Sequence, residues 1–423
     1  MSELALTIRT LAEAALAASR QLAVLSTDRK NAVLTTLASL LESETPALLA
    51  ENAKDLAAGE ANGLTAALLD RLRLSQQRLS QMADGVRQVA SLPDPLGELL
   101  ETTTRPNGII IRKVRVPIGV IGIIYEARPN VTIDCAALCF KSGNAAILRG
   151  GKEAVHSNAA LAALVRRALR QHGVPEDCVQ IIPTTDRTAL EHLLKLDDLV
   201  NCIIPRGGEA LIRFVAEHAR MPVIKHYKGV CNLYIHLGTD VEMAVEIAIN
   251  AKCQRPGVCN AIENLFVHEG AAERILPVVA RALVAKGVEL RGDAATISLL
   301  TKKGIPVVPA TEEDYFEEYL ALILAVKIVP DLSAAIDAVN HYGSHHSDAI
   351  LTGDAYAAER FLNEVDSATV YWNASTRFTD GYEFGFGAEI GISTDKLHAR
   401  GPMGLRELTT YKFTITGTGQ IRA

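Results

Sequence analysis

The chain lacks a long hydrophobic run. Its longest nearly apolar stretch, Tyr319–Val326, ends at Lys327, and the apolar segment 118–125 is equally short. A helix that crosses a bilayer needs about 20 apolar residues. The N-terminus, with Glu3 and Arg9 among its apolar residues, has the spacing of an amphipathic helix and lacks the apolar core of a signal peptide. We therefore expect no membrane partner and a cytoplasmic location.

The sequence also lacks an excess of positive charge. It has 43 Lys and Arg residues against 49 Asp and Glu residues, a formal net charge of −6. Proteins that bind nucleic acid neutralise phosphates with basic residues, so we expect no nucleic-acid partner. Apolar residues (48%) and charged residues (22%) lie in the globular range, which excludes disordered and collagen-like classes. The length of 423 residues predicts two or three domains.

The cysteines lack the spacing of a disulfide framework or a zinc site. They are odd in number, scattered, and show no C-x-x-C pair. The seven are Cys135, Cys139, Cys178, Cys202, Cys231, Cys253 and Cys259. His345 and His346 suggest acid–base catalysis or a metal, but adjacent histidines point in different directions and a third ligand is not evident. We expect mostly buried cysteines and no metal.

The first part of the chain, residues 1 to about 96, has the apolar spacing of helices, which begins with Leu4 and Ile8. Between residues 101 and 117, β-branched and charged residues replace this pattern. Pro106-Asn107-Gly108 is a turn sequence between two short extended runs. We predict a β-hairpin in residues 101–117.

Short apolar runs alternate with helical patterns over the rest of the chain. The predicted strands form a first series, 120–125, 145–148, 179–182, 199–204 and 232–235, and a second series, 264–267, 306–308, 323–329, 349–351 and 369–372. Strands that alternate with helices build βαβ units and a largely parallel, doubly wound sheet. Two series predict two α/β lobes. The alternating residues 408–416 predict a terminal edge strand, which usually pairs with another element.

The segment Gln254–Ala261, Q-R-P-G-V-C-N-A, places Cys259 in a loop with proline and glycine. A cysteine attacks a carbonyl as its thiolate, which backbone N–H groups and a nearby cation such as Arg255 favour. The same N–H groups can hold the oxyanion that forms on attack. This pattern indicates a nucleophile. A buried structural cysteine is the alternative interpretation, because free cysteines are often buried.

Two glycine clusters directly follow predicted strands. Arg149-Gly150-Gly151-Lys152 follows the strand at 145–148, and Arg206-Gly207-Gly208 follows the strand at 199–204. Ligands of open α/β sheets bind beyond the carboxyl ends of strands, where glycines let backbone amides approach phosphate. Neither cluster is a G-x-G-x-x-G fingerprint, and a strand-to-helix turn alone is the alternative explanation. The basic residues favour an anion site.

Segment 373–393 follows the last predicted strand of the second series. It is rich in glycine and contains Asn373 and Arg377. This composition is typical of a binding loop on a rigid scaffold. A compact structural loop is the alternative.

From about residue 115 onward the chain resembles the aldehyde dehydrogenase superfamily. Residues 143–151 are similar to the segment that meets the adenosine ribose, with Arg149 at the position of its lysine. Residues 250–261 resemble the nucleophile loop, and Glu318 lies in a segment similar to the one that holds the nicotinamide ribose. The resemblance implies an aldehyde dehydrogenase-like α/β fold, with two doubly wound α/β lobes and a small β oligomerisation region.

Four longer stretches resemble the gamma-glutamyl phosphate reductase family, a branch of this superfamily. They are Ile124–Thr132, Gln254–Asn260, His345–Ile350 and the stretch from Asn373 to Leu405. Several long matches in order are more specific than one short motif. They imply an NADPH-dependent reduction of L-glutamyl 5-phosphate to L-glutamate 5-semialdehyde in proline biosynthesis. Phosphate leaves, and the acyl group passes through a thioester on Cys259.

The chain departs from hydrolytic aldehyde dehydrogenases at two places. Their E-L-G-G-K segment, whose glutamate activates water, corresponds here to residues 225–232, K-H-Y-K-G-V-C-N, which contain no glutamate. A phosphorylating enzyme needs no such base, because phosphate is the other partner of the acyl-cysteine. Their oxyanion-hole asparagine falls at Ala127 or Arg128, close to Asn130.

The resemblance also implies roles for other residues. The candidate ligands of the acyl phosphate and the substrate carboxylate are Arg128, Asn130, Arg255, Asn373 and Arg377. Guanidinium groups suit such anions. The candidate NADP(H) ligands are Arg149, Gly150, Gly151, Lys152, Arg206, Gly207, Gly208 and Glu318. Arg149 and Lys152 supply positive charge for a 2′-phosphate.

The implied domain boundaries follow from the same resemblance. We expect a dinucleotide-binding domain in residues 1–100 and 118–235 and a catalytic domain in residues 236–390. Residues 101–117 and 391–423 form the oligomerisation hairpin and strand of a homo-oligomer. Functional coupling to glutamate 5-kinase is a further expectation. Two alternatives stay open, a reductase of another acyl phosphate or acyl thioester and a non-catalytic oligomeric binding protein.

Overall fold

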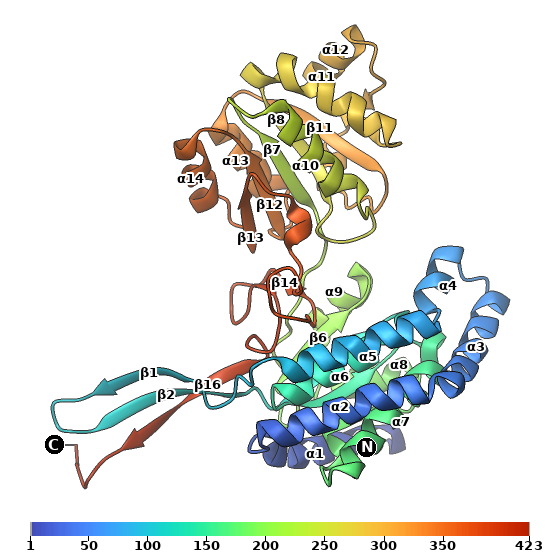
Figure 1. Cartoon of the computed structure of the whole chain (residues 1–423), viewed down its shortest axis with the longest axis vertical. Coiled ribbons are helices and arrows are strands. Elements are labelled where there is room, and N and C mark those ends of the chain that lie inside the picture. Colours follow the sequence, from blue (N-terminus) through green and yellow to red (C-terminus); the bar gives the residue numbers. More distant parts are fainter. Residues whose placement is uncertain (1, 423) are drawn as a thin grey trace. The chain divides into compact units, whose positions relative to one another are not determined.

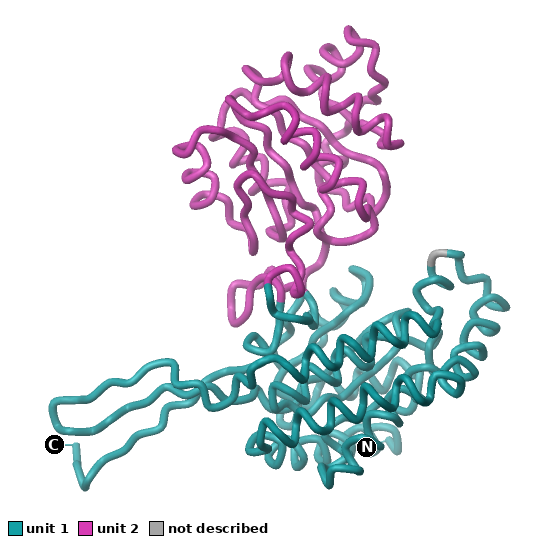
Figure 2. The backbone as a smooth tube through the Cα atoms, in the orientation of Figure 1, with its two compact units in different colours: residues 1–225, 385–391, 403–423 teal, residues 226–384, 392–402 magenta. Residues whose placement is uncertain are grey.

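The computed structural model describes residues 2–422, which fall into two compact units (Figure 2). Unit 1 comprises the chain up to Lys225 together with Gly385–Gly391 and the residues from Met403 onward. Unit 2 comprises His226–Phe384 and Ile392–Pro402. Within residues 2–422, no helix combines the length and hydrophobicity that a membrane span requires.

Unit 1 begins with helices whose apolar residues recur at helical spacing. Helix α1 (Glu3–Leu22) buries Ile8 and Ala12 on one face, and its first turn is capped by Ser2, which accepts a hydrogen bond from the Ala5 N–H. The helices that follow are α2 (Thr27–Ser43), α3 (Thr45–Ala61), α4 (Ala66–Leu72) and α5 (Gln76–Ser91). They confirm the predicted helical region (Figure 1).

The core of unit 1 is a parallel sheet with the strand order β5-β4-β3-β6. Its strands are β3 (Val120–Tyr125), β4 (Ala145–Arg149), β5 (Val179–Ile181) and β6 (Cys202–Arg206). The connecting elements are α6 (Asn130–Lys141), η1 (Lys152–Ala154), α7 (Val155–Gln171), η2 (Glu176–Cys178), α8 (Arg187–Leu193) and α9 (Glu209–His218). Strands β3 and β4 are buried along their whole length, as expected of apolar runs in a parallel sheet.

An antiparallel ribbon also belongs to unit 1. Its strands are β1 (Leu99–Thr104), β2 (Ile110–Pro117) and β16 (Thr409–Thr416), with β2 in the middle. The predicted hairpin and terminal strand are therefore confirmed, and the partner of the terminal strand is β2. Tyr411, Phe413 and Ile415, which alternate along β16, are exposed.

Unit 2 is built on a parallel sheet with the order β10-β9-β11-β8-β7-β12-β13. Its strands are β7 (Cys231–Ile235), β8 (Ile262–His268), β9 (Glu289–Gly292), β10 (Val308–Pro309), β11 (Ile323–Val329), β12 (Ser347–Leu351) and β13 (Thr369–Trp372). Its helical elements are α10 (Val241–Cys253), α11 (Glu269–Ala285), α12 (Ala294–Lys302), η3 (Glu313–Phe316), α13 (Leu332–Tyr342), α14 (Ala355–Glu364) and η4 (Thr376–Phe378). A short antiparallel pair, β14 (Ile392–Ser393) and β15 (Gly401–Pro402), completes the unit.

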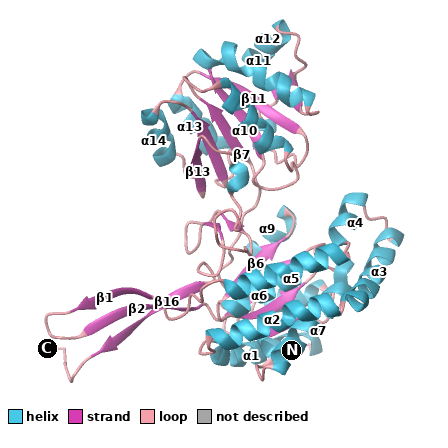
Figure 3. Ribbon diagram, viewed as in Figure 1, coloured by secondary structure: helices cyan, strands magenta, loops and turns pink. Residues whose placement is uncertain are grey.

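Helices cover both faces of this sheet (Figure 3). Leu233 and Ile235 of β7 pack in a cluster with apolar residues of α10, α11 and α12. Tyr234, which lies between them, packs in another cluster with residues of α13 and α14. This alternation is the period-two pattern of a strand buried on both faces, and it confirms the predicted doubly wound α/β class.

The predicted strands of both series are present, although the one predicted at 306–308 is observed as β10 (Val308–Pro309), and the strands β9, β14 and β15 were not predicted. Strand β9 was not predicted, because its sequence E-L-R-G has one apolar residue and no alternation that the pattern could detect. The expected boundary between the lobes lies at residue 235, whereas the compact units separate at Lys225. Strand β7 pairs with β8 and β12, and this pairing places residues 231–235 in unit 2.

Candidate active site around Cys259

Cys259 lies in the loop that connects α10 to β8, where its side chain is half-buried. This loop precedes strand β8, so it lies at the amino edge of the unit 2 sheet. The segments that precede β7 and β12 lie at the same edge of the sheet and contact each other, and the segment before β7 also contacts the loop of Cys259. The Val230 N–H, just before β7, donates to Ser344 Oγ, just before β12 (2.9 Å). The site is therefore assembled from loops at the amino edge of the strands.

Gly229 allows the segment before β7 to pack against Cys259. A Cβ atom at position 229 would lie 2.4 Å from Cys259 Cα and 2.3 Å from Cys259 O. Both atoms are backbone, so only glycine fits without a shift of the loop. Two residues later, the Cys231 thiol donates to the Cys259 carbonyl oxygen (3.1 Å). Residues 229–231 thus hold one side of the loop.

The substrate-loop candidate Arg377 holds the other side. Its Nε donates to Gln254 Oε1 (2.9 Å), and its terminal nitrogen donates to Asn260 Oδ1. The Thr376 hydroxyl donates to the Asn260 carbonyl oxygen (2.7 Å). Asn260 Nδ2 in turn donates to the Thr379 carbonyl oxygen (2.9 Å). Both ends of the nucleophile loop are therefore tied to η4 and the residue that follows it.

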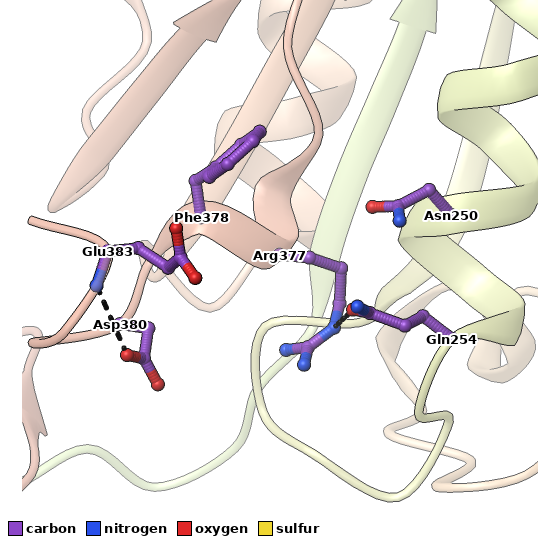
Figure 4. A pocket seen from close by; sticks show the side chains of 6 residues that line it. All are labelled: Asn250, Gln254, Arg377, Phe378, Asp380 and Glu383. Carbon is purple, nitrogen blue, oxygen red and sulfur yellow. Dashed lines mark hydrogen bonds between the residues drawn. The ribbon is translucent and has the colours of Figure 1, made fainter.

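A polar cavity of about 190 Å³ lies beside this contact (Figure 4). It is lined by Asn250, Gln254, Arg377, Phe378, Asp380 and Glu383. Figure 4 shows the Arg377 guanidinium beside the Gln254 amide, which fixes its plane. The lining combines amides, a guanidinium and carboxylates, and such groups recognise a small polar ligand rather than an apolar one.

Two guanidinium groups lie close enough to interact electrostatically near Cys259. Burial lowers the pKa of Arg377, and the charge of Arg255 lowers it further, whereas Cys259 and Asp380 oppose both effects. An arginine stays protonated under such shifts. The region therefore carries positive charge that suits a thiolate or an anionic substrate.

A row of buried polar side chains crosses the sheet beneath this region. Asp348, Asn232 and Asn264 occupy paired positions on β12, β7 and β8 and are fully buried. Asn232 Nδ2 donates to Asp348 Oδ1 (2.6 Å), and Asn264 Nδ2 donates to Asn232 Oδ1 (2.8 Å). Burial raises the pKa of Asp348 to about 6, against hydrogen bonds from Ser367 and Asn232 that lower it. The row fixes the strand that carries Cys231.

Glu318 lies in the loop between η3 and β11, also in unit 2. Its neighbour Tyr319 donates a hydrogen bond to Asp314 Oδ1 (2.9 Å), and Arg291 donates to the same oxygen (2.7 Å). Burial raises the pKa of Asp314, but the Thr311 N–H and the hydrogen bonds from Arg291 and Tyr319 outweigh it and lower this pKa to about 2. The residue next to Glu318 is thus firmly held.

In unit 1, Arg149 ends β4 at the carboxyl edge of the sheet and is nine-tenths buried. One terminal nitrogen donates to the Thr185 carbonyl oxygen (3.1 Å), but its Nε has no hydrogen-bond partner among the described residues. Burial lowers the pKa of Arg149, and the nearby charge of Glu153 opposes this. Gly150 is packed so closely that an added Cβ would lie 2.1 Å from Asn158 Nδ2. Lys152, at the start of η1, is exposed.

Arg206, Gly207 and Gly208 end β6 and open α9. The Gly208 N–H donates to Glu126 Oε2 (3.1 Å), and an added Cβ at Gly207 would lie 2.5 Å from the same oxygen. A carboxylate of the protein therefore already interacts with the amino end of this helix, as the macrodipole favours. This backbone geometry can accept an anion.

The remaining candidates are placed as follows. Asn130 is the first residue of α6 and donates to Asp134 Oδ2 (2.9 Å), whereas Arg128 precedes the helix. Ala127, one of the two positions expected to correspond to the hydrolytic asparagine, has a left-handed φ of 46°, and its N–H donates to Glu153. Asn373 in unit 2 bonds to the backbone of Thr352 through both its amide nitrogen and its amide oxygen.

The structure brings together Cys259, Arg255 and Arg377 within unit 2, and it places the strand-end candidates of β4 and β6 at one edge of unit 1. Gly229, Gln254 and Asn260 were not predicted as functional residues. Only the close approach of backbones identifies Gly229, although Gln254 and Asn260 lie within the recognised loop. Among residues 2–422, no three His, Cys, Asp or Glu side chains are grouped so that they hold a metal ion.

Comparison with known proteins identifies the family. Residues 5–296 match the model of the aldehyde dehydrogenase family. The chain is 60% identical to the gamma-glutamyl phosphate reductase of Opitutus terrae over the full length of both proteins. It is 56% identical to that of Carboxydothermus hydrogenoformans, covering 98% of this chain and 99% of the relative.

A solved structure agrees with these sequence matches. The crystal structure of gamma-glutamyl phosphate reductase from Thermotoga maritima superposes with a TM-score of 0.96 at 43% sequence identity. The match covers 98% of this chain and all of that chain.

Proposed function

Because this chain belongs to the aldehyde dehydrogenase family and, within it, to the gamma-glutamyl phosphate reductases, we propose that it reduces L-glutamyl 5-phosphate to L-glutamate 5-semialdehyde with release of phosphate. This reaction is a step of proline biosynthesis. The observation that carries the proposal is the loop of Cys259, which Gly229, Cys231 and Arg377 hold in one place. A nucleophile needs such fixed geometry to act as an effectively intramolecular reactant.

The Cys259 thiolate attacks the acyl carbon, the bond to phosphate breaks, and a thioester forms on the sulfur. A reduced nicotinamide cofactor, when bound, supplies the hydride that reduces this thioester. The resulting thiohemiacetal collapses as its carbon–sulfur bond breaks, so the aldehyde leaves and Cys259 is regenerated. Arg255 and Arg377 supply positive charge beside the sulfur while these bonds change.

Residues 225–232 contain no glutamate or aspartate. Gly229 of this segment lies against Cys259, so the segment that carries the water-activating glutamate of a hydrolytic enzyme supplies no carboxylate here. Phosphate rather than water is therefore the partner that completes the reverse reaction. This distinguishes the proposed reductase from a hydrolytic aldehyde dehydrogenase.

Arg128, Asn130, Arg255, Asn373 and Arg377 are the proposed ligands of the acyl phosphate and of the substrate carboxylate. Arg377 is the best supported of these, because the hydrogen bonds to Gln254 and Asn260 orient its guanidinium beside a polar cavity. A planar guanidinium that is fixed in this way suits a bidentate contact with an oxyanion.

The proposed cofactor is NADP(H). Arg149 and Lys152 suit its 2′-phosphate, and the buried Arg149 Nε, which has no acceptor within residues 2–422, fits an anion at this strand end. The Gly150 and Gly151 turn and the Arg206–Gly208 turn offer backbone amides for the diphosphate. Glu318 is the proposed partner of the nicotinamide ribose.

Assembly and location are further parts of the proposal. The β1-β2-β16 ribbon ends in strands with unpaired edges, and Tyr411, Phe413 and Ile415 are exposed on it. An edge of this kind can pair with another copy, which supports a homo-oligomer. A cytoplasmic location and functional coupling to glutamate 5-kinase suit an enzyme whose substrate is a labile acyl phosphate.

The test measures NADP+ reduction with glutamate 5-semialdehyde, in phosphate buffer and in a phosphate-free buffer. Turnover that requires phosphate and disappears in Cys259→Ala supports the proposed reductase. Turnover without phosphate indicates a hydrolytic dehydrogenase. Turnover with coenzyme A or with succinyl or aspartyl analogues in place of these reactants supports the alternative acyl substrates, and no turnover at all supports a binding protein.

A further inference from the structure

A buried ion pair joins the two ends of the loop that carries Cys259. Lys252, in the last turn of α10, donates to Glu263 Oε2 in the second position of β8. Both side chains have no exposed surface. The two residues lie seven positions before and four positions after Cys259, so the pair joins the two ends of the chain segment that carries the nucleophile.

The second oxygen of Glu263 reaches a different segment. Glu263 Oε1 accepts a hydrogen bond from the Leu320 N–H (3.4 Å), and Leu320 has a left-handed φ of 53°. A leucine pays a conformational penalty in this region, so surrounding contacts must hold it there. The Leu320 carbonyl oxygen also lies 3.8 Å from the position of a Cβ at Gly257. The loop 317–320 thus packs on the nucleophile loop.

Glu318 is followed directly by two anchored residues. Leu320 is held by Glu263, and Tyr319 is held by its hydrogen bond to Asp314. The Lys252 ammonium lies 5.9 Å from the centre of the Tyr319 ring, close enough for a cation–π contact. Burial raises the pKa of Glu263, and the charge of Glu318 raises it further. A single buried carboxylate therefore links Lys252, the start of β8 and the loop of Glu318.

Such a pair is a costly way to stabilise a fold. Burial raises the pKa of Glu263 and lowers the pKa of Lys252, because each charge loses its hydration. Apolar side chains of similar volume are often equally stabilising in place of a buried ion pair. A role in positioning the two loops explains why Lys252 is a donor and why Glu263 accepts hydrogen bonds through both of its oxygens.

We propose that Glu263 is a positioning residue that sets the loop of Glu318 against the nucleophile loop, so that the hydride donor meets the acyl group on Cys259. The inference rests on the proposed function, in which Glu318 holds the nicotinamide ribose. Loss of this contact leaves the nucleophile intact and displaces the cofactor ring. A displacement of about 1 Å between reacting groups lowers turnover on the order of 100-fold.

The test replaces the pair in two ways. Lys252→Met with Glu263→Leu removes both charges and the acceptor for Leu320, while it preserves side-chain volume. Lys252→Met with Glu263→Gln removes both charges but keeps an amide oxygen that can accept the Leu320 N–H. A matched control is Lys30→Met with Asp94→Leu, which removes a buried pair of unit 1 in which Asp94 also accepts a backbone N–H, that of Leu96. Thermal unfolding identifies the variants that fold.

Three readouts are compared in the folded variants: kcat, KM for the cofactor, and the rate of Cys259 alkylation by iodoacetamide. The leucine variant is expected to lose about 10- to 100-fold in kcat and to raise the cofactor KM several-fold, with an alkylation rate within about twofold of wild type. The glutamine variant is expected to recover most of this loss, and the control to keep wild-type kinetics.

The proposal is overturned if the folded leucine variant has wild-type kcat and KM, if the control loses as much activity, or if alkylation slows by the same factor as kcat while KM is unchanged. Equilibrium binding of NADPH, followed by fluorescence, tests the positioning role even if the proposed reaction is wrong. An inactive wild type refutes the reaction. Weaker NADPH binding by the leucine variant still supports the positioning role, and equal binding contradicts it.

Discussion

The loop of Cys259 and the glycine turns of unit 1 carry the sequence signals for function, but they are held in different ways. The loop at 254–261 is fixed by polar contacts from distant parts of the chain, above all those of Arg377. The turns at Gly150 and Gly207 have no room for a side chain, because polar groups of neighbouring residues occupy the space where a Cβ atom would lie. Substitutions in the first region should therefore act on turnover, and those in the second on cofactor affinity.

The largest effect is expected from removing the nucleophile. Cys259→Ala should lower turnover by at least about 10⁴-fold, because no other group forms the thioester. NADPH binding should persist, since the change removes one sulfur atom from the site. Steady-state assays and a fluorescence titration measure the two properties. Substantial residual turnover would mean that another group is the nucleophile.

Gly229→Ala tests whether the packing of segment 229–231 fixes the loop. The added Cβ would meet the backbone of Cys259 at 2.4 Å, so the loop must move, and we expect kcat to fall on the order of 100-fold. Gly85→Ala, where a Cβ meets no atom within 4 Å, is the matched control and should keep full activity. Equal kcat values for the two variants would contradict this account of the loop.

Arg377→Lys tests the contact on the other side. A lysine keeps the charge but loses the planar fork that binds Gln254 and Asn260, and we expect kcat/KM to fall about 10- to 100-fold. Arg281→Lys, on the exposed surface of α11, should have wild-type kinetics. A wild-type kcat/KM in Arg377→Lys would show that charge alone is needed.

Asp348, in the row of buried polar side chains, makes the free energy of unfolding depend on pH. Its folded pKa, about 6, is above its ordinary value of 3.8, so the folded state binds more protons than the unfolded state between these values. The contribution is fully present below pH 3.8 and is lost as pH rises through 6. The change is at most about 1.4 kcal/mol per pH unit. Asp348→Asn should flatten the dependence of unfolding free energy on pH between 4 and 7, and an unchanged slope would exclude this source.

The smallest effect is expected in unit 1. A Cβ at Gly208 meets no atom within 4 Å, so Gly208→Ala should leave folding unchanged. If the cofactor diphosphate approaches the amide at the start of α9, KM for NADPH should rise up to about tenfold, which corresponds to about 1.4 kcal/mol. An unchanged KM would separate this turn from the cofactor site.

The sequence predicts the α/β architecture and the nucleophile loop because both are written in local patterns. Apolar runs identified the buried strands β3, β4, β7 and β8, and proline and glycine marked the loop of Cys259. Long-range contacts left no local signal. The approach of Gly229 to Cys259 and the bond of Glu263 to Leu320 join residues 30 and 57 positions apart, and only the folded chain shows them.

The glycine turns of unit 1 lie at carboxyl strand ends, where we expect ligands of an α/β sheet to bind, but Cys259 does not. Cys259, the proposed nucleophile, lies at the amino edge of its sheet, between α10 and β8. The proline, the glycine and Arg255 beside Cys259 marked that loop, and the resemblance to a family then supported it, whereas the general rule for α/β sheets did not. Strand β9 was missed for a different reason, because its sequence contains one apolar residue, which is too few for a strand pattern.

The central claim is that Cys259 carries the acyl group, and peptide mapping of the trapped intermediate tests it most directly. The protein is mixed with glutamate 5-semialdehyde and NADP+ without phosphate, quenched with acid and digested, and each cysteine peptide is weighed. The account predicts one glutamyl group on the peptide of Cys259, which disappears when phosphate is added before the quench. An adduct on another cysteine, or none while NADPH still forms, would contradict it.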